Sequence, residues 1–180
     1  MRTSAITICI AGAAALAAVG LAVPASAHGL FKVNVCSLIP SKALSGADLD
    51  AGCVQLPTTH GRNYIAVYTG NWGKQIVIGG ADHFLGFQVI KPTSAYLARA
   101  KQALPRMAAE PNFKMSHGVV ESVTDYSYGK KEGFSGFATR IVNGYICNVT
   151  LFDRSETDPP TKSDVESTLF LIAQFCNKVK

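Results

Sequence analysis

The chain has 180 residues, of which 48% are hydrophobic and 16% are charged, and its formal net charge is +5. Its lysines and arginines are scattered, and Lys130 and Lys131 are the only adjacent pair, which argues against a nucleic-acid-binding stripe. No hydrophobic run of membrane-spanning length follows the N-terminal segment. A nucleic-acid-binding protein and a multispanning membrane protein are therefore set aside.

Residues 1–27 have the organisation of a secretory signal peptide. Arg2 supplies the positive n-region, residues 6–23 form the apolar h-region, and residues 25–27 (ASA) are an A-x-A cleavage site. The apolar run is also long enough for a retained membrane anchor, but the small-residue site favours removal. No cysteine directly follows the h-region, so a lipid anchor is not expected. We predict an exported, soluble protein, either secreted or located in the periplasm or cell envelope.

The mature chain, residues 28–180, has a suitable size for a single domain. It keeps four of the five cysteines, because Cys9 lies in the leader. An even number of cysteines in an exported chain favours disulfides over a metal site or a free thiol, and no C-x-x-C motif is present. Four cysteines allow three pairings. We predict the bonds Cys36–Cys53 and Cys147–Cys176.

The first half of the mature chain contains short elements separated by turn-forming residues. A strand is predicted over residues 28–35, a short helix over 36–46 and a loop over 58–62. Glycine-containing segments at 69–73 and 79–82 are predicted to be turns between three strands. Those strands span residues 63–68, 74–78 and 84–90.

A central helix is predicted over residues 92–107. Pro92 suits a first helical turn, and apolar residues recur at helical spacing as far as Leu104. Pro105 should end or kink this helix. The following residues, 113–128, mix apolar and polar side chains in a strand-like way, and residues 129–133 are predicted to be an exposed turn.

Residues 134–152 contain the strongest local signal, a predicted β-hairpin. Asn143 and Gly144 separate two runs rich in β-branched and aromatic residues, and both tolerate the positive φ that a two-residue type I′ turn needs. This turn would pair Val142 with Tyr145 and Arg140 with Cys147. Alternation then gives the second strand a core face made of Tyr145, Cys147, Val149 and Leu151.

The C-terminal segment is predicted to be a helix that Ser163 caps, with Glu166 completing a capping box. Its apolar stripe directs Cys176 towards the core, as the hairpin directs Cys147, and this shared direction is the reason for pairing these two cysteines. The stripe consists of Val165, Leu169, Ile172, Cys176 and Val179. The elements together predict an α+β fold, in which a twisted, mostly antiparallel sheet is packed by the central and C-terminal helices and held by two disulfides.

The new N-terminus offers a candidate copper site. Cleavage after residue 27 makes His28 the first residue, so that its free amine and imidazole could share a metal with a second histidine, which could be His60, His83 or His117. We take His117, expected mid-strand or at a bulge, as the candidate partner. The sequence Ala-His-Gly at the cleavage site resembles the start of mature bacterial lytic polysaccharide monooxygenases, which implies a copper-binding protein or copper oxidase. The rest of that family's pattern is not found downstream.

The sequence does not contain the complete motifs of other enzyme classes. Residues 133–136 (GFSG) lack the second glycine of a nucleophile elbow, because Phe137 stands there. The chain contains no phosphate-binding glycine loop, no H-x-x-x-H pair and no evident pair of inward-facing carboxylates. We therefore expect no catalytic residues and no cofactor other than the alternative copper.

Three aromatic residues are candidate ligand contacts. Trp72 lies in the predicted turn at 69–73, and Tyr126 and Tyr128 end a predicted strand. An aromatic side chain at a turn can contact a ligand or a partner protein, although such a side chain more often folds back over the sheet.

Residues 36–46 (CSLIPSKALSG) resemble the opening of small actinobacterial extracytoplasmic proteins, namely lipoproteins of unknown function and sensor-like domains of receptor kinases. Those families also carry paired disulfides, a twisted antiparallel sheet and a closing C-terminal helix. The resemblance implies a non-catalytic binding domain for a small ligand or for an envelope or extracellular protein. The chain departs from the lipoproteins by lacking a lipidation cysteine.

Overall fold

The computed structural model describes residues 33–39, 53–78, 81–128, 131–153 and 160–180, which all belong to one unit, Lys32–Lys180. The predicted leader and most of the predicted elements at 28–35 and 36–46 lie outside the described residues. In the part that is described, a short 3-10 helix, η1 (Val35–Ser37), replaces the predicted strand end and helix start.

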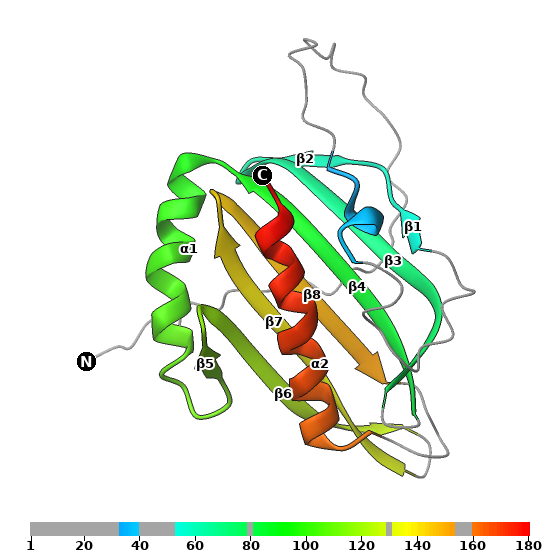
Figure 1. Ribbon diagram of the computed structural model, residues 1–180. Coiled ribbons are helices and arrows are strands. Elements are labelled where there is room, and N and C mark those ends of the chain that lie inside the picture. The colour runs from blue at the N-terminus through cyan, green and yellow to red at the C-terminus, as the bar shows by residue number, and fades with distance from the viewer. Residues whose placement is uncertain (1–32, 40–52, 79–80, 129–130, 154–159) are drawn as a thin grey trace. The chain divides into compact units, whose positions relative to one another are not determined.

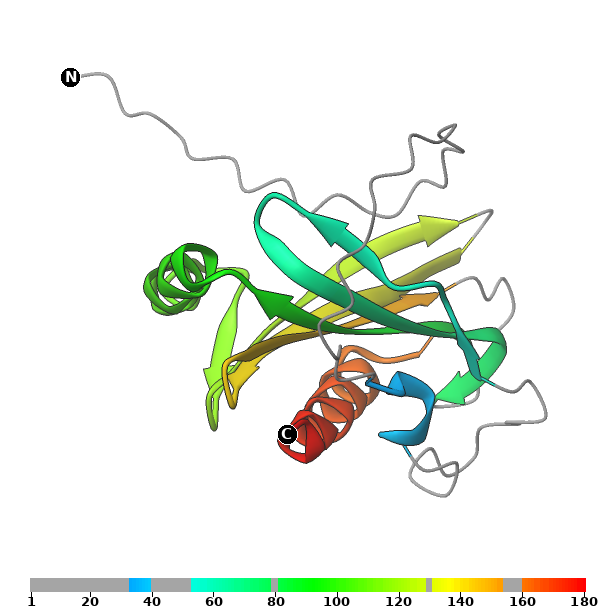
Figure 2. The same cartoon turned by 90° about the horizontal axis from the view of Figure 1, so that it is seen from above.

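The described strands form one eight-stranded sheet in the order β1-β3-β4-β8-β7-β6-β5, with β2 also paired to β3 (Figure 1). Every pairing is antiparallel. Helix α2 (Lys162–Gln174) lies on one face of the sheet, and helix α1 (Ser94–Met107) lies at one end of it (Figure 2). This arrangement confirms the predicted α+β class. The strands are β1 (Cys53–Gln55), β2 (Thr59–Gly61), β3 (Tyr64–Ile78), β4 (Ala81–Pro92), β5 (Lys114–Ser116), β6 (Val119–Tyr128), β7 (Lys131–Val142) and β8 (Tyr145–Asp153).

The hairpin of β7 and β8 has the predicted turn and register. Asn143 and Gly144 have φ values of 49° and 80°, the positive values that a type I′ turn requires. Val142 is paired with Tyr145, and Arg140 is paired with Cys147. The second strand therefore directs the predicted residues, from Tyr145 to Leu151, into the core.

The predicted turn at residues 69–73 is wrong, because those residues lie inside β3. Pairing with β4 continues on both sides of this segment, and the register shifts between Trp72 and Ile76. Gly70 is paired in register with Phe87, and Gly73 lies within the irregularity, so pairing with β4 outweighs the local turn preference. The predicted loop at 58–62 likewise contains a short strand, β2.

The predicted continuous strand at 113–128 is divided into β5 and β6 by a second tight turn. His117 and Gly118 have φ values of 49° and 77°, and Ser116 is paired with Val119. The expectation that His117 lies mid-strand or at a bulge is therefore wrong. The left-handed conformation that histidine and glycine share here closes a two-residue hairpin.

Helix α1 begins at Ser94, later than predicted, and helix α2 has a different N-terminal cap than predicted. Thr93 caps α1, and Pro105 lies inside the helix without ending it. Thr161, rather than Ser163, caps α2, because its hydroxyl accepts a hydrogen bond from the Asp164 amide while the Asp164 carboxylate accepts one from the Thr161 amide. The predicted pair of Ser163 and Glu166 is thus wrong.

The core lies between α2 and the face of the sheet that this helix covers. The whole predicted stripe is buried, with Val165, Leu169, Ile172 and Cys176 each 0% exposed and Val179 2% exposed. Phe87, Val89, Val149 and Leu151 are among the sheet residues in the same core. Gly136 permits this approach, since a Cβ atom there would lie 2.6 Å from Leu169 Cδ1 and 2.8 Å from the Ser122 carbonyl oxygen.

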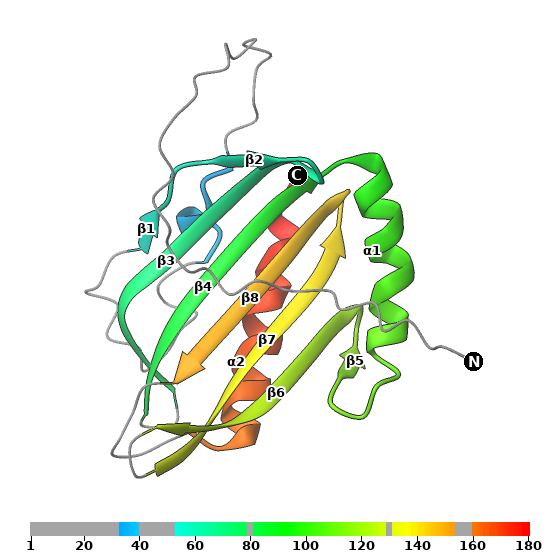
Figure 3. The same cartoon turned by 180° about the vertical axis from the view of Figure 1, so that it is seen from behind.

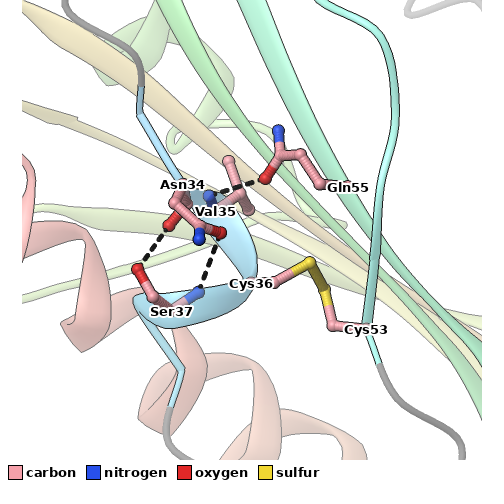
Figure 4. Close-up of a disulfide and its surroundings, with 6 residues drawn as sticks. All are labelled: Asn34, Val35, Cys36, Ser37, Cys53 and Gln55. Carbon is pink, nitrogen blue, oxygen red and sulfur yellow. Dashed lines mark hydrogen bonds between the residues drawn. A yellow bond between two sulfur atoms is a disulfide. The ribbon is translucent and has the colours of Figure 1, made fainter.

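The predicted bond between Cys36 and Cys53 is present and ties η1 to β1 (Figure 4). Asn34 caps η1 by accepting a hydrogen bond from the Ser37 amide, and the Val35 amide donates to Gln55 Oε1 at 2.8 Å. The bond closes a separation of 17 residues, for which a chain-entropy estimate gives about 3 kcal/mol of stabilisation. This edge of the sheet is therefore fixed both covalently and by hydrogen bonds.

The contact at Gly136 generates a testable prediction. We expect Gly136→Ala to lower the free energy of unfolding by about 1–3 kcal/mol, because the added methyl group meets both α2 and the backbone of β6. Gly86→Ala is the matched control: a Cβ atom there has its nearest contact at 3.7 Å, and the change should be neutral or stabilising by under about 1 kcal/mol. Urea denaturation measures both variants. Equal stabilities would contradict this account of the packing between α2 and the sheet.

Candidate functional site

The structure separates the three aromatic residues proposed as ligand contacts. Trp72 is 5% exposed and belongs to the core, so its ring offers little surface to a ligand. Tyr126 and Tyr128 lie in β6, where their backbones are opposite Gly133 and Lys131. Only the backbone of these two tyrosines is described, and it lies at the edge of the sheet beyond the end of β5.

The histidines do not form a metal site within the described residues. The chain described here contains no group of three or more His, Cys, Asp or Glu side chains that could hold a metal ion. His117 is exposed in the β5–β6 turn, and its ring lies 5.7 Å from the ring of Phe170 in α2. His28 lies outside the described residues, so the copper hypothesis stays a prediction.

One edge of the sheet is only partly covered. Strand β7 pairs with the whole of β6, whereas β5 pairs only with Val119, Val120 and Glu121. Figure 1 shows β6 continuing past the end of β5. Residues 122–128, which we call the outer edge, therefore have no strand partner on that side within the described part of the chain.

A cavity of about 510 Å³ lies beside the outer edge, and we call it the edge groove. Four consecutive residues of β6, from Ser122 to Asp125, line it, although alternate residues of a strand point to opposite faces of the sheet. Such a cavity must pass around the edge of the strand, where the main chain is accessible. The lining residues are Asn112, Phe113, Ser122, Val123, Thr124, Asp125, Phe137 and Lys162.

The wall of the edge groove is fixed by two interactions of the segment that follows α1. The Ser122 hydroxyl donates a hydrogen bond to the Asn112 carbonyl oxygen at 2.7 Å. The rings of Phe113 and Phe137 meet edge to face, with their centroids 5.7 Å apart. Thr124, Asp125 and Lys162 are exposed. The groove thus combines an aromatic wall, hydroxyl and amide groups, one carboxylate and one ammonium group.

The hairpin registers determine which main-chain groups point into the edge groove. Residues that flank a two-residue turn exchange both of their main-chain hydrogen bonds, as Val142 does with Tyr145 and Ser116 with Val119. Because the direction of these groups alternates from one residue to the next along a strand, the main-chain N–H and C=O groups of Ser122 and Thr124 point towards β7. By the same alternation, the N–H and C=O groups of Val123, Asp125 and Ser127 point outwards.

Glu121 is a buried carboxylate at the position where the pairing of β6 with β5 ends. It is 4% exposed, and among the described residues its Oε2 atom has no hydrogen-bond partner. The Lys114 ammonium lies 4.0 Å from its Oε1 atom and also 4.0 Å from Oε2 of Glu166 in α2. Burial raises the pKa of the Glu121 carboxyl, Lys114 opposes this shift and Glu166 adds to it.

Cys147 and Cys176 lie next to each other in the core, as predicted, but they are thiols here rather than a disulfide. Their side chains are hydrogen-bonded to each other. This hydrogen bond, together with burial, raises the pKa of the Cys147 thiol. A buried, protonated thiol is a poor nucleophile.

Comparisons with known proteins identify no relative of this chain. No protein-family profile matches it, and no curated protein or solved structure is significantly similar to it. Among the described residues, no helix is both long enough and apolar enough to cross a membrane.

Sequence reasoning did not find the edge groove. Its residues come from the segment after α1, from β6 and β7 and from the start of α2, and none has unusual chemistry. The one available signal was His117-Gly118, a dipeptide that accepts positive φ and so predicts a short hairpin.

Glu121 generates a prediction about pH. The folded protein binds this proton more tightly than the unfolded chain does, because the folded-state pKa lies above the ordinary value of 4.5. The contribution of Glu121 to stability therefore falls as the pH rises from that value through the folded-state pKa. We expect Glu121→Gln to gain stability relative to the native protein as the pH rises above 4.5.

Urea denaturation at several pH values tests this prediction. Glu110→Gln is the control, because it removes a carboxylate at an exposed position. If the free energies of unfolding of the native protein and of Glu121→Gln differ by the same amount at every pH, the protonation of Glu121 does not affect folding stability.

Proposed function

We propose that the protein is an exported, non-catalytic binding domain of the envelope or extracellular space and that the edge groove is its binding site. The observation that carries this proposal is a cavity that opens onto unpaired main chain and is lined by aromatic, hydroxyl, amide and charged groups. Such groups can bind a polar ligand through hydrogen bonds, charge and contact with the aromatic rings. Its lining residues supply a single carboxylate and no cysteine or histidine, so they offer little acid–base or nucleophilic chemistry.

Export is supported by the leader pattern at residues 1–27 and by the bond between Cys36 and Cys53. We propose that Cys147 and Cys176 form a second disulfide in the exported protein. Their hydrogen-bonded side chains already place the two sulfur atoms together, and an exported chain meets oxidising conditions. This bond would tie β8 to η3 (Phe175–Lys178), which directly follows α2.

The second disulfide is open to a direct test. We expect peptide mapping of the exported, non-reduced protein by mass spectrometry to recover one fragment that contains both Cys147 and Cys176. We also expect Cys147→Ala combined with Cys176→Ala to lower the free energy of unfolding by about 2–4 kcal/mol under oxidising conditions. Alkylation of both thiols after unfolding without a reductant would contradict the bond.

Binding in the edge groove predicts a local response to ligand. Thr124→Cys places a reactive thiol in the groove, and Thr58→Cys places one at an exposed position near the opposite edge of the sheet. Each variant carries an environment-sensitive dye and is titrated with casein-derived peptides, soluble cell-wall glycan and phospholipid vesicles. We expect a saturable signal from at least one class at Thr124 that is absent at Thr58.

Two results would argue against this proposal. A lack of response at Thr124 to all three classes would remove the groove as a binding site, and turnover in a hydrolase or oxidase screen would contradict the non-catalytic role. Tight one-to-one copper(II) binding that is lost when one alanine precedes His28 would instead support the copper alternative.

A further inference from the structure

We propose that the edge groove takes an extended segment of another polypeptide, which adds to the sheet as a strand beside β6 and carries a basic side chain opposite Asp125. This inference rests on the proposed binding function and names the class of its ligand. In recognition by strand addition, main-chain hydrogen bonds supply affinity and side-chain pockets supply specificity.

The main chain of the outer edge has the groups that strand addition requires. Val123, Asp125 and Ser127 turn three N–H and three C=O groups away from β7, and no described strand pairs with them. The pairing of β6 with β7 continues through this segment without a register shift. A new strand would therefore meet a regular template rather than a bulge.

Apart from the charge of Asp125, the outer edge lacks the features that normally prevent strand addition. Edge strands are usually protected by short length, proline, lysine or a bulge. Residues 122–128 (SVTDYSY) form a seven-residue segment with neither proline nor lysine. At the other edge, by contrast, β1 and β2 have three residues each, Pro57 lies between them and the disulfide at Cys53 fixes the chain.

The side chains of the edge groove suit alternate side chains of an added strand. An added strand would direct its own side chains alternately to the two faces of the sheet. On the face opposite α2, Phe113 and Phe137 offer an aromatic wall and Ser122 is held by Asn112. On the face of α2, Asp125 and Lys162 supply charge.

Charge argues against a second copy of this chain as the occupant. An antiparallel pair of outer edges that uses all three outward-facing residues must place Val123 opposite Ser127 and Asp125 opposite the Asp125 of the other copy. Like charges directly opposite each other destabilise a strand pair, whereas opposite charges stabilise it. Pairing with the outer edge of a second copy is therefore disfavoured, and pairing with a strand that has lysine or arginine opposite Asp125 is favoured.

The test uses a seven-residue peptide of alternating threonine and valine with arginine at its centre, and a second peptide with glutamate there. Amide chemical shifts of the isotope-labelled, exported protein are followed during titration. We expect the largest shifts at the amides of Val123, Asp125 and Ser127, and binding of the arginine peptide that is at least about threefold tighter. Methylation of alternate peptide nitrogens should abolish binding, because it removes main-chain donors.

A charge reversal supplies the matched comparison. Asp125→Lys should bind the glutamate peptide more tightly than the arginine peptide, whereas Glu110→Lys, the same change of charge at an exposed residue outside the lining, should keep the native order. Urea denaturation verifies that both variants fold.

Three outcomes would overturn the inference. Shifts spread away from the outer edge, or equal binding of the methylated peptides, would exclude strand addition. Concentration-dependent shifts of the same three amides without peptide would assign the edge to a second copy. A response of the Thr124 dye to glycan or vesicles, with no peptide-induced shifts, would retain the binding function and reject a polypeptide ligand.

Discussion

The type I′ turn at Asn143-Gly144 sets the register on which the rest of the structure depends. A slip of one residue between β7 and β8 would send Cys147, Val149 and Leu151 to the face opposite α2 and remove the surface on which that helix packs. The same register passes through β7 to β6 and decides which main-chain groups of β6 point outwards. A two-residue turn thus determines which residues face the core and which main-chain groups of the outer edge point outwards.

The edge groove arises because a second hairpin is short. The turn at His117-Gly118 leads into β5, which covers only three residues of β6. Beyond them, the segment after α1 closes the opposite side through Asn112 and Phe113. The site that we propose for binding therefore follows from the unequal lengths of two adjacent strands.

Two buried polar features lie in the interface between α2 and the sheet. Glu121 has an oxygen without a hydrogen-bond partner in the described part of the chain, and such a buried polar atom costs free energy that the surrounding apolar contacts must offset. The thiols of Cys147 and Cys176 are hydrogen-bonded to each other, and a disulfide between them would fix the C-terminal segment on β8. Both features lie next to the C-terminal helical segment, Glu121 through the Lys114 contact with Glu166 and Cys147 through Cys176.

The sequence by itself determined the features that depend on neighbouring residues: the Asn143-Gly144 hairpin with its register, the apolar stripe of α2, the bond between Cys36 and Cys53 and the α+β class. Tertiary structure decided the features in which distant partners compete with local preference. Pairing with β4 kept the glycine-rich segment around Trp72 inside β3, and the ring of Trp72 is buried in the core. The edge groove depends on where β5 stops along β6 and on which distant segment covers the gap, and no local pattern encodes either of these.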